Sequence, residues 1–235
     1  MRIPFLKKEG YEADDIIATL VTEALADGSG IDQVLILTGD RDSIQLVTER
    51  STVLYPMRGV SDLARMTPPY VEDRYGVPPA RYPELAALVG ETSDNLPGVP
   101  GVGQGFAAKW INQYDGLDNV ITHADEITGK KGEALREHLA DVIRNRRLNA
   151  LVTDLDLEKH PTDLEWPSYD RQAVHTLFDG LEFTVLRTRL LEALPTEEEA
   201  AIDDSGFDVS MRVLGTGELA GWLADNAAGT GRVGI

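Results

Sequence analysis

Residues 33–43 read QVLILTGDRDS, an apolar run that changes at once into a cluster of polar residues. Residues 33–38 have the length of a strand and end at Gly39. Such a continuous apolar run is typical of a strand covered on both faces of a parallel sheet. Asp40 and Asp42 follow directly, and open α/β sheets bind their ligands beyond the carboxyl ends of their strands. The stretch therefore predicts an α/β fold with a polar site at one sheet edge, although a turn and a helix cap would explain the same carboxylates.

The segments around this stretch extend the prediction. Residues 12–27 repeat apolar side chains at helical spacing and predict an amphipathic helix that Gly28 ends. Residues 52–55 predict a second strand, which Pro56 ends. Further helices are expected over residues 69–75, 83–89, 104–114, 118–124, 132–148, 171–179 and 183–194. One helix, two strands and then many helices indicate an α/β layer joined to a helical layer.

The chain is strongly acidic, with 22 basic and 40 acidic residues in 235 and a formal net charge of −18. Such a charge argues against a nucleic-acid partner. The charge is unevenly spread, because residues 1–150 carry a net −7, residues 151–208 a net −11 and residues 209–235 none. The acidic run 196–206 has few apolar residues and predicts a solvated linker. The total charge therefore excludes no nucleic-acid partner for the first 150 residues.

Two absences narrow the class of protein. The sequence has no cysteine, which excludes disulfides, thiol catalysis and cysteine-based metal sites. It has no run of 18 apolar residues and no signal peptide at its start, so we expect no membrane partner and a cytoplasmic location.

Three clusters of carboxylates are candidates for a metal site. They are Glu12, Asp14 and Asp15, then Asp40 and Asp42, then Glu91 and Asp94. Helix capping would explain the first cluster and a polar loop the third. Oxygen ligands alone favour Mg²⁺ or Mn²⁺, and carboxylates converge only if cations neutralise them. Two such ions about 3.5–4 Å apart form the usual centre for phosphodiester hydrolysis.

A glycine-rich hairpin follows in residues 96–110, LPGVPGVGQGFAAKW. Its glycines permit close approach of the backbone to another molecule, and the amides at the start of the next helix suit a phosphate. We therefore expect contacts to DNA phosphates, although an ordinary Gly/Pro loop would fit the same residues. The candidate DNA-binding residues are Gly98, Val99, Gly101, Val102, Gly103, Gln104 and Lys109. A basic group at residues 144–147 would serve DNA or the end of a helix equally well.

The motifs at residues 11–15, 38–42 and 90–99, together with the hairpin, resemble the family of 5′–3′ exonuclease domains of bacterial DNA polymerase I, within the flap-endonuclease superfamily. The resemblance covers about residues 1–195. It implies a PIN/resolvase-like nuclease core followed by a helix–hairpin–helix (H3TH) subdomain. It also implies metal-dependent cleavage of DNA at 5′ flaps, nicks and RNA-primed ends in replication and repair. The seven carboxylates would bind two or more Mg²⁺ (or Mn²⁺) ions, and the hairpin would bind K⁺. Glu91 stands where the family more often has Asp.

The resemblance divides the chain into four parts. Residues 1–95 would be the C-terminal part of the nuclease core, 96–195 the helical subdomain, 196–206 the linker and 207–235 the start of a 3′–5′ exonuclease-like domain. The family's domain begins well before Met1, so the sequence looks N-terminally truncated, with polymerase domains expected downstream. We therefore expect a nucleoid-associated protein whose chain cuts DNA weakly or not at all by itself. The alternative is a non-catalytic module that binds duplex or flapped DNA.

Overall fold

The computed structural model describes residues 2–166, 169–193, 215, 217–218 and 221–222. The chain divides into two compact units, Arg2–Ser168 and the part from Tyr169 onward. The predicted linker at 196–206 and the predicted domain start at 207–235 lie outside the described residues, apart from those few positions. Within the described part, no helix is long and apolar enough to cross a membrane.

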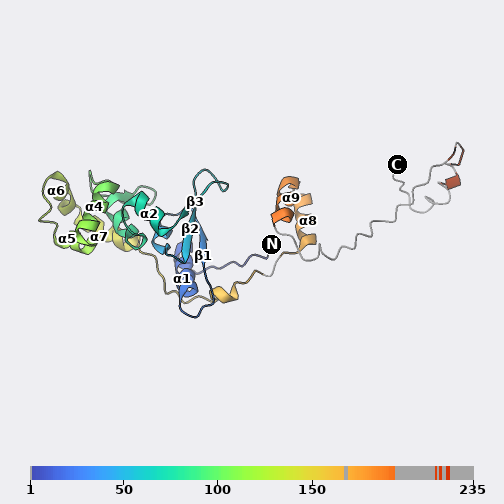
Figure 1. The fold of residues 1–235 in the computed structure, drawn as a ribbon, viewed down its shortest axis with the longest axis horizontal. Coiled ribbons are helices and arrows are strands. Elements are labelled where there is room, and N and C mark those ends of the chain that lie inside the picture. Colours follow the sequence, from blue (N-terminus) through green and yellow to red (C-terminus); the bar gives the residue numbers. More distant parts are fainter. Residues whose placement is uncertain (1, 167–168, 194–214, 216, 219–220, 223–235) are drawn as a thin grey trace. The chain divides into compact units, whose positions relative to one another are not determined.

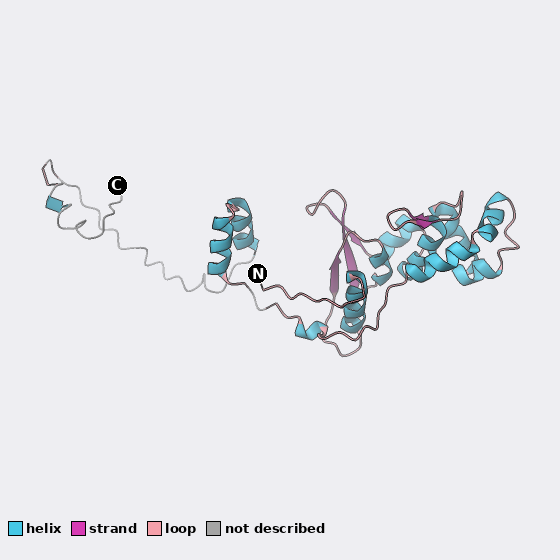
Figure 2. Cartoon of the chain, turned by 180° about the vertical axis from the view of Figure 1, so that it is seen from behind, coloured by secondary structure: helices cyan, strands magenta, loops and turns pink. Residues whose placement is uncertain are grey.

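The first unit combines a small sheet with a group of helices (Figures 1 and 2). Its strands are β1 (Val34–Leu37), β2 (Ser51–Pro56), β3 (Leu63–Met66), β4 (Gly90–Glu91) and β5 (Leu96–Pro97). Its α-helices are α1 (Ala13–Leu25), α2 (Pro68–Tyr75), α3 (Tyr82–Val89), α4 (Gln104–Tyr114), α5 (Leu117–Thr122), α6 (Lys130–Glu137) and α7 (Leu139–Leu148). The α/β fold class with a following helical layer is confirmed.

The three-stranded sheet has the order β1-β2-β3. β1 and β2 are parallel, as the apolar run of β1 predicted. β3 pairs with β2 in the antiparallel direction, and the sequence analysis did not predict this strand. Ile36, Val53 and Met66 are buried on the face against which α1 packs. β1 ends at Leu37, and the turn that carries Asp40 and Asp42 follows it directly.

The prediction that the first strand is covered on both faces is wrong. The side chains of Leu35 and Leu37 are 55% and 61% exposed. β1 pairs with β2 alone in the described part of the chain, and α1 covers only the face that carries Ile36. An apolar run shows that a strand suits burial, but it does not show which part of a protein covers each face.

The helical layer is built around α3, which packs against α4 and α7. The helix predicted over 104–114 matches α4 in full. The single helix predicted over 132–148 is wrong, because the chain breaks at His138 and forms α6 and α7. His138, with φ −109° and ψ 16°, leaves the helical conformation between the two helices, and its ring lies 3.1 Å from the Asp141 carboxylate in the first turn of α7.

The second unit contains α8 (Arg171–Gly180) and α9 (Thr184–Ala193). The two helices pack against each other, and the rings of Phe178 and Phe183 meet edge to face. Both helices agree with the predicted ranges.

Candidate functional site

The three carboxylate clusters meet at two cavities of the first unit. One, of about 550 Å³, is lined by Glu12, Asp14, Asp15, Asp40, Asp42 and Asp94. The other, of about 520 Å³, is lined by Asp40, Glu91 and Asp94. Asp40 and Asp94 belong to both, so the cavities adjoin and the structure brings all seven predicted carboxylates to one acidic surface.

The first cluster combines helix capping with exposure to the cavity. Glu12 is the N-cap of α1 and forms a capping box with Asp15, whose carboxylate accepts the Glu12 amide at 3.4 Å. The other oxygen of Asp15 accepts the amide of Val152 at 2.9 Å. The capping interpretation therefore accounts for Glu12 and Asp15, whereas the carboxyl of Asp14 interacts with that of Asp40, which lines the same cavity.

The second cluster sits in a turn that its own side chains organise. Thr38 Oγ1 accepts the Asp40 amide at 3.0 Å, and Asp40 Oδ1 accepts the Asp42 amide at 2.9 Å. Asp42 then begins a short 3₁₀ helix, Asp42–Leu46. Oδ1 of Asp42 is buried and has no hydrogen-bond partner among the described residues.

The third cluster lies on a tight hairpin between α3 and the glycine-rich segment. Gly90 has a φ of +80°, which turns the chain out of α3 into β4, and Glu91 pairs with Leu96 of β5. Asp94 is exposed in the intervening turn, whereas Oε2 of Glu91 is buried without a partner in the part of the chain that the structure describes.

On the acidic surface, the pKa values of three carboxyl groups are raised. Burial, followed by interaction with Asp40, raises the pKa of Asp14 to about 6. Burial, followed by repulsion from Glu91 and Asp40, raises the pKa of Asp42 to about 7. The pKa of Glu91 is also raised, first by burial and then by Asp94. These carboxylates oppose one another's charge, so a bound cation would lower the electrostatic free energy of the site.

The donor set has the chemistry of a hard-cation site without a preformed cage. Among the residues that the structure describes, no group of three or more His, Cys, Asp or Glu side chains could hold a metal ion. Mg²⁺, however, usually takes one or two carboxylates and completes its octahedron with water or phosphate oxygens. The partnerless oxygens of Asp42 and Glu91 fit that requirement.

The glycine hairpin presents backbone on one side and buries side chains on the other. A Cβ at Gly98 would stand 1.9 Å from the carbonyl oxygen of Val89, so only glycine fits there. The side chains of Val99 and Val102 are 3% and 5% exposed and anchor the hairpin, so only their backbone could meet a ligand. Gly101, with a φ of +75°, is exposed and has open space around it.

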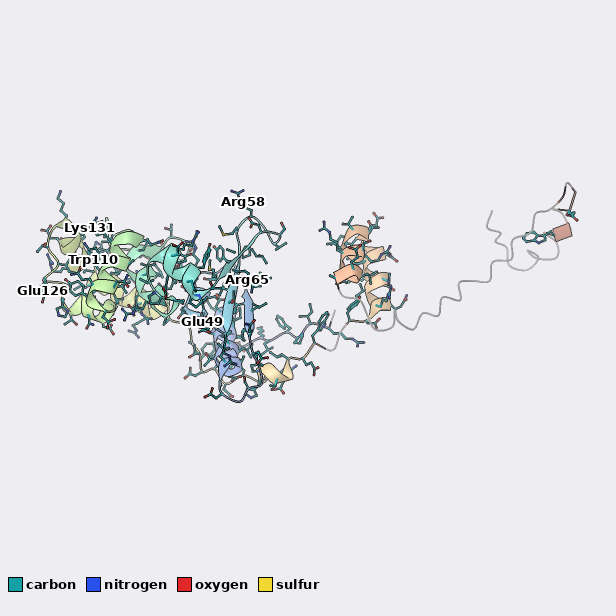
Figure 3. The ribbon with its side chains drawn as sticks, in the orientation of Figure 1. Glu49, Arg58, Arg65, Trp110, Glu126 and Lys131 are labelled. Carbon is teal, nitrogen blue, oxygen red and sulfur yellow. The ribbon has the colours of Figure 1, made fainter. Side chains whose placement is uncertain are left out.

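The remaining predicted contacts lie on α4. Gly103 is the exposed N-cap, and the Gln104 amide group donates to the Arg74 carbonyl at 2.6 Å. Lys109 lines a separate cavity of about 440 Å³ that also contains Trp110 and Lys131. Figure 3 shows Trp110 and Lys131 on the helical side of the first unit, away from the sheet. Lys109 is therefore not part of the acidic surface.

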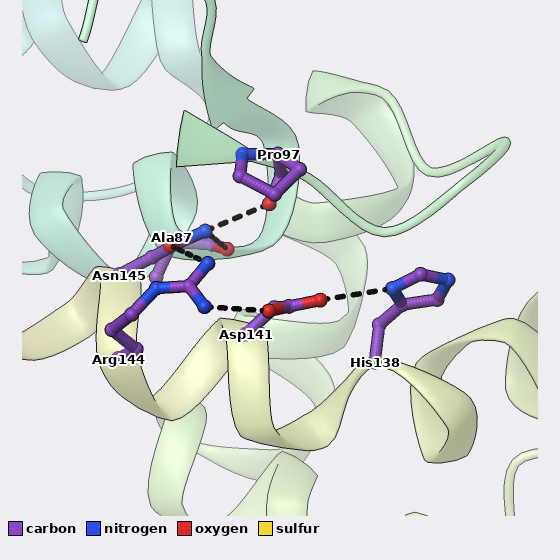
Figure 4. A network of polar contacts seen from close by, with 6 residues as sticks. All are labelled: Ala87, Pro97, His138, Asp141, Arg144 and Asn145. Carbon is purple, nitrogen blue, oxygen red and sulfur yellow. Dashed lines mark hydrogen bonds and ion pairs between the residues drawn. The ribbon is translucent and has the colours of Figure 1, made fainter. Parts of the chain in front are cut away.

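A buried amide that the sequence analysis did not single out fixes the hairpin in place. Asn145 of α7 is fully buried and donates to the carbonyls of Pro97 at 2.9 Å and Ala87 at 3.4 Å (Figure 4). On the exposed side of α7, Asp141 accepts from Arg144 at 2.8 Å. Asn145 lies between charged residues in the sequence, and no local pattern distinguishes it from its exposed neighbours.

An acidic surface at the end of a small sheet, followed by a glycine hairpin on a helical layer, is the arrangement expected from the resemblance to resolvase-like nucleases. Two family models match the chain. The model described as "5'-3' exonuclease, N-terminal resolvase-like domain" matches residues 1–76, and "5'-3' exonuclease, C-terminal SAM fold" matches residues 77–172. Together they span most of the chain, and the chain belongs to the 5′–3′ exonuclease family.

The relatives are longer proteins. The chain is 50% identical to DNA polymerase I of Mycobacterium leprae over 99% of its own length, and 36% identical to DNA polymerase I of Bacillus subtilis over 88%. It spans about a quarter of each, 25% and 23%.

Solved structures agree on the fold. The phage T5 D15 protein crystallised with metal ions gives a TM-score of 0.56 at 22% identity, over 64% of this chain and 54% of that one. A T5 5′-exonuclease mutant gives the same score at 23% identity, over 64% and 59%.

Proposed function

We propose that the chain is the 5′-nuclease portion of a DNA polymerase I and hydrolyses DNA phosphodiesters at 5′ flaps, nicks and RNA-primed ends. The observation that carries this proposal is the convergence of seven carboxylates from three segments on two adjoining cavities. Membership of the 5′–3′ exonuclease family and the names of the relatives support it. Replication and repair are the processes that such an activity serves.

Divalent cations, Mg²⁺ or Mn²⁺, are the proposed cofactors. Asp42 and Glu91 would hold them through their partnerless oxygens, and Asp14, Asp40 and Asp94 would complete the ligand set directly or through water. Bound there, the ions supply an activated water and stabilise the charge that develops on the phosphate. Glu12 and Asp15 remain proposed ligands whose capping contacts also fix the start of α1. K⁺ at the hairpin is likewise a proposal.

DNA is the proposed partner of the hairpin. The exposed backbone of Gly101 and Gly103, directly before α4, suits phosphate oxygens of a duplex regardless of its sequence. Because Val99 and Val102 anchor this backbone in the core, its conformation would be preorganised for DNA binding.

We expect the chain by itself to cleave slowly. The described residues include no group of three or more side chains that could hold a metal ion, so metal binding depends on water and substrate oxygens. The alternative, a module that holds flapped duplex without cutting it, is not favoured by the family to which the chain belongs.

The test is single-turnover cleavage of a labelled 5′-flap duplex by excess chain, with Mg²⁺, with Mn²⁺ and with EDTA. The proposal expects slow, metal-dependent cleavage that Asp40→Ala abolishes while duplex binding is kept. The matched control, Asp62→Ala, removes an exposed acid from the β2–β3 turn and should cleave normally. Tight duplex binding without cleavage in either metal would favour the binding module. No duplex binding at all would contradict both functions.

A further inference from the structure

The segment from Arg147 to Val152 forms a wall of the acidic cavity that none of the carboxylate motifs supplies. The cavity of about 550 Å³ is lined by Arg147, Asn149 and Val152 as well as by the carboxylates. The segment contains the last two residues of α7, Arg147 and Leu148, and the stretch that follows, so it approaches the site from the helical layer.

Hydrogen bonds tie this wall to both sides of the site. The side-chain amide of Gln45 donates to the carbonyl of Asn149 at 2.9 Å and to the carbonyl of Asp42 at 2.8 Å, which joins the wall to the Asp42 turn. At the other end, the amide of Val152 donates to Asp15 at 2.9 Å. The position of Arg147 relative to the carboxylates is therefore set by the fold.

Arg147 is the one basic residue among the described residues that line this cavity. Its side chain is exposed, and it forms no ion pair with any residue that the structure describes. Arg144, three residues earlier, is bound to Asp141. A guanidinium that stands at an acidic cavity without pairing to its carboxylates remains available for an anion from outside, and its planar donors match a phosphate.

A second side chain of the wall also lacks a partner. Asn149 is 1% exposed, and its Nδ2 is buried with no hydrogen-bond acceptor among the described residues. A buried donor without an acceptor costs free energy, which a ligand oxygen at the cavity would recover. A cation cannot fill this role, since Nδ2 and the guanidinium are both donors.

We propose that Arg147, assisted by Asn149, binds the substrate phosphate that enters the carboxylate site. This inference rests on the proposed function, because it names the residues that hold the substrate of that same site. The phosphate belongs to the DNA strand at a flap or nick, whereas the glycine hairpin binds the continuous duplex. The two elements therefore contribute to different parts of one substrate.

The test measures binding of two labelled DNAs by fluorescence anisotropy, in Ca²⁺ and in EDTA. One DNA is a 5′-flap duplex, and the other is a dumbbell whose closed ends leave no flap or nick. In Ca²⁺, Arg147→Ala should weaken flap binding about tenfold and dumbbell binding at most about twofold, since a charge-assisted bond to one phosphate is lost. Arg147→Lys should recover part of the loss, because it keeps the charge without the planar fork.

Arg146→Ala is the matched control, since it removes the neighbouring positive charge outside the cavity and should leave the preference for the flap unchanged. Thermal melting of each variant checks folding. Equal loss on both DNAs would place Arg147 on the general duplex surface and overturn the inference, as would no loss on either. Failure of the unaltered chain to bind any DNA would overturn the proposed function as well.

Discussion

Asp42→Asn should make the metal-free protein more stable at neutral pH, although it removes a proposed metal ligand. The pKa of Asp42 rises from 3.8 to about 7, first because the group is buried and then because Glu91, Asp40 and Asp94 repel its charge. Above pH 7 the folded protein must hold this carboxylate ionised against that cost. Asn keeps the shape of the side chain and carries no charge.

The sign and size follow from proton linkage. Between pH 4 and 7 the unfolded chain has released the proton of Asp42 while the folded chain still holds it, so stability falls as pH rises through this window. A shift from 3.8 to about 7 sets a ceiling of about 4 kcal/mol. Because the carboxylate is partly open to solvent, we expect about 1–2 kcal/mol, or about 2–8 °C in melting temperature.

The assay is thermal melting in EDTA from pH 4 to 8, repeated with Mg²⁺ at pH 8. The Asn variant and the unaltered protein should melt together near pH 4 and separate as pH rises to 7, with a constant difference above it. Mg²⁺ should stabilise the unaltered protein more than the variant. Asp73→Asn, at an exposed carboxylate outside both cavities, controls for the loss of one charge. A variant no more stable than the unaltered protein at pH 8, or one that gains equally from Mg²⁺, would refute the reasoning.

Three further predictions concern the scaffold of the site. Gly98→Ala should destabilise the protein by more than about 3 kcal/mol in urea unfolding, because its Cβ would stand 1.9 Å from a backbone oxygen; a loss below 1 kcal/mol would contradict the tight packing. Asn145→Ala should cost about 2–3 kcal/mol in the same assay and weaken duplex binding, since the carbonyls of Pro97 and Ala87 lose their donor. Arg144→Ala, on the exposed face of α7, should leave the urea midpoint nearly unchanged, and a clear loss of stability would show that its contact with Asp141 is more than a surface pair.

Local sequence patterns predicted where helices and strands lie better than they predicted what packs against each of them. The range 104–114 matches α4 because its helical period, its glycine N-cap and its apolar face agree. The break at His138 was not predicted, because the helical period of the sequence continues through it while the backbone of this one residue leaves the helical conformation. Leu35 and Leu37 show the same limit, because their exposure depends on what packs against β1.

The candidate site was predictable wherever the chemistry of single residues is enough. Carboxylates that follow a strand or begin a helix are recognisable in the sequence, and all seven reach the same acidic surface. Asn145 and Asn149 were not recognisable, because an asparagine becomes informative only when burial and missing or matched partners are known. Arg147 was visible only as one member of a basic group at a helix end. Only the structure distinguishes it from Arg144 and Arg146, because Arg147 lines the acidic cavity and the other two do not.

The scaffold holds the carboxylates through contacts that do not require a cation. Asp15 is fixed by the capping box and by Val152, Asp40 by its bond to the Asp42 amide, and Glu91 by its pairing with Leu96. The backbone therefore sets the positions of these groups while their charges oppose one another. A cation that binds here would chiefly offset repulsion and would need to reorganise few backbone contacts. Cation binding should consequently raise the melting temperature of the first unit with little change in its secondary structure, and substitutions that break the scaffold should lower cation affinity without removing any carboxylate.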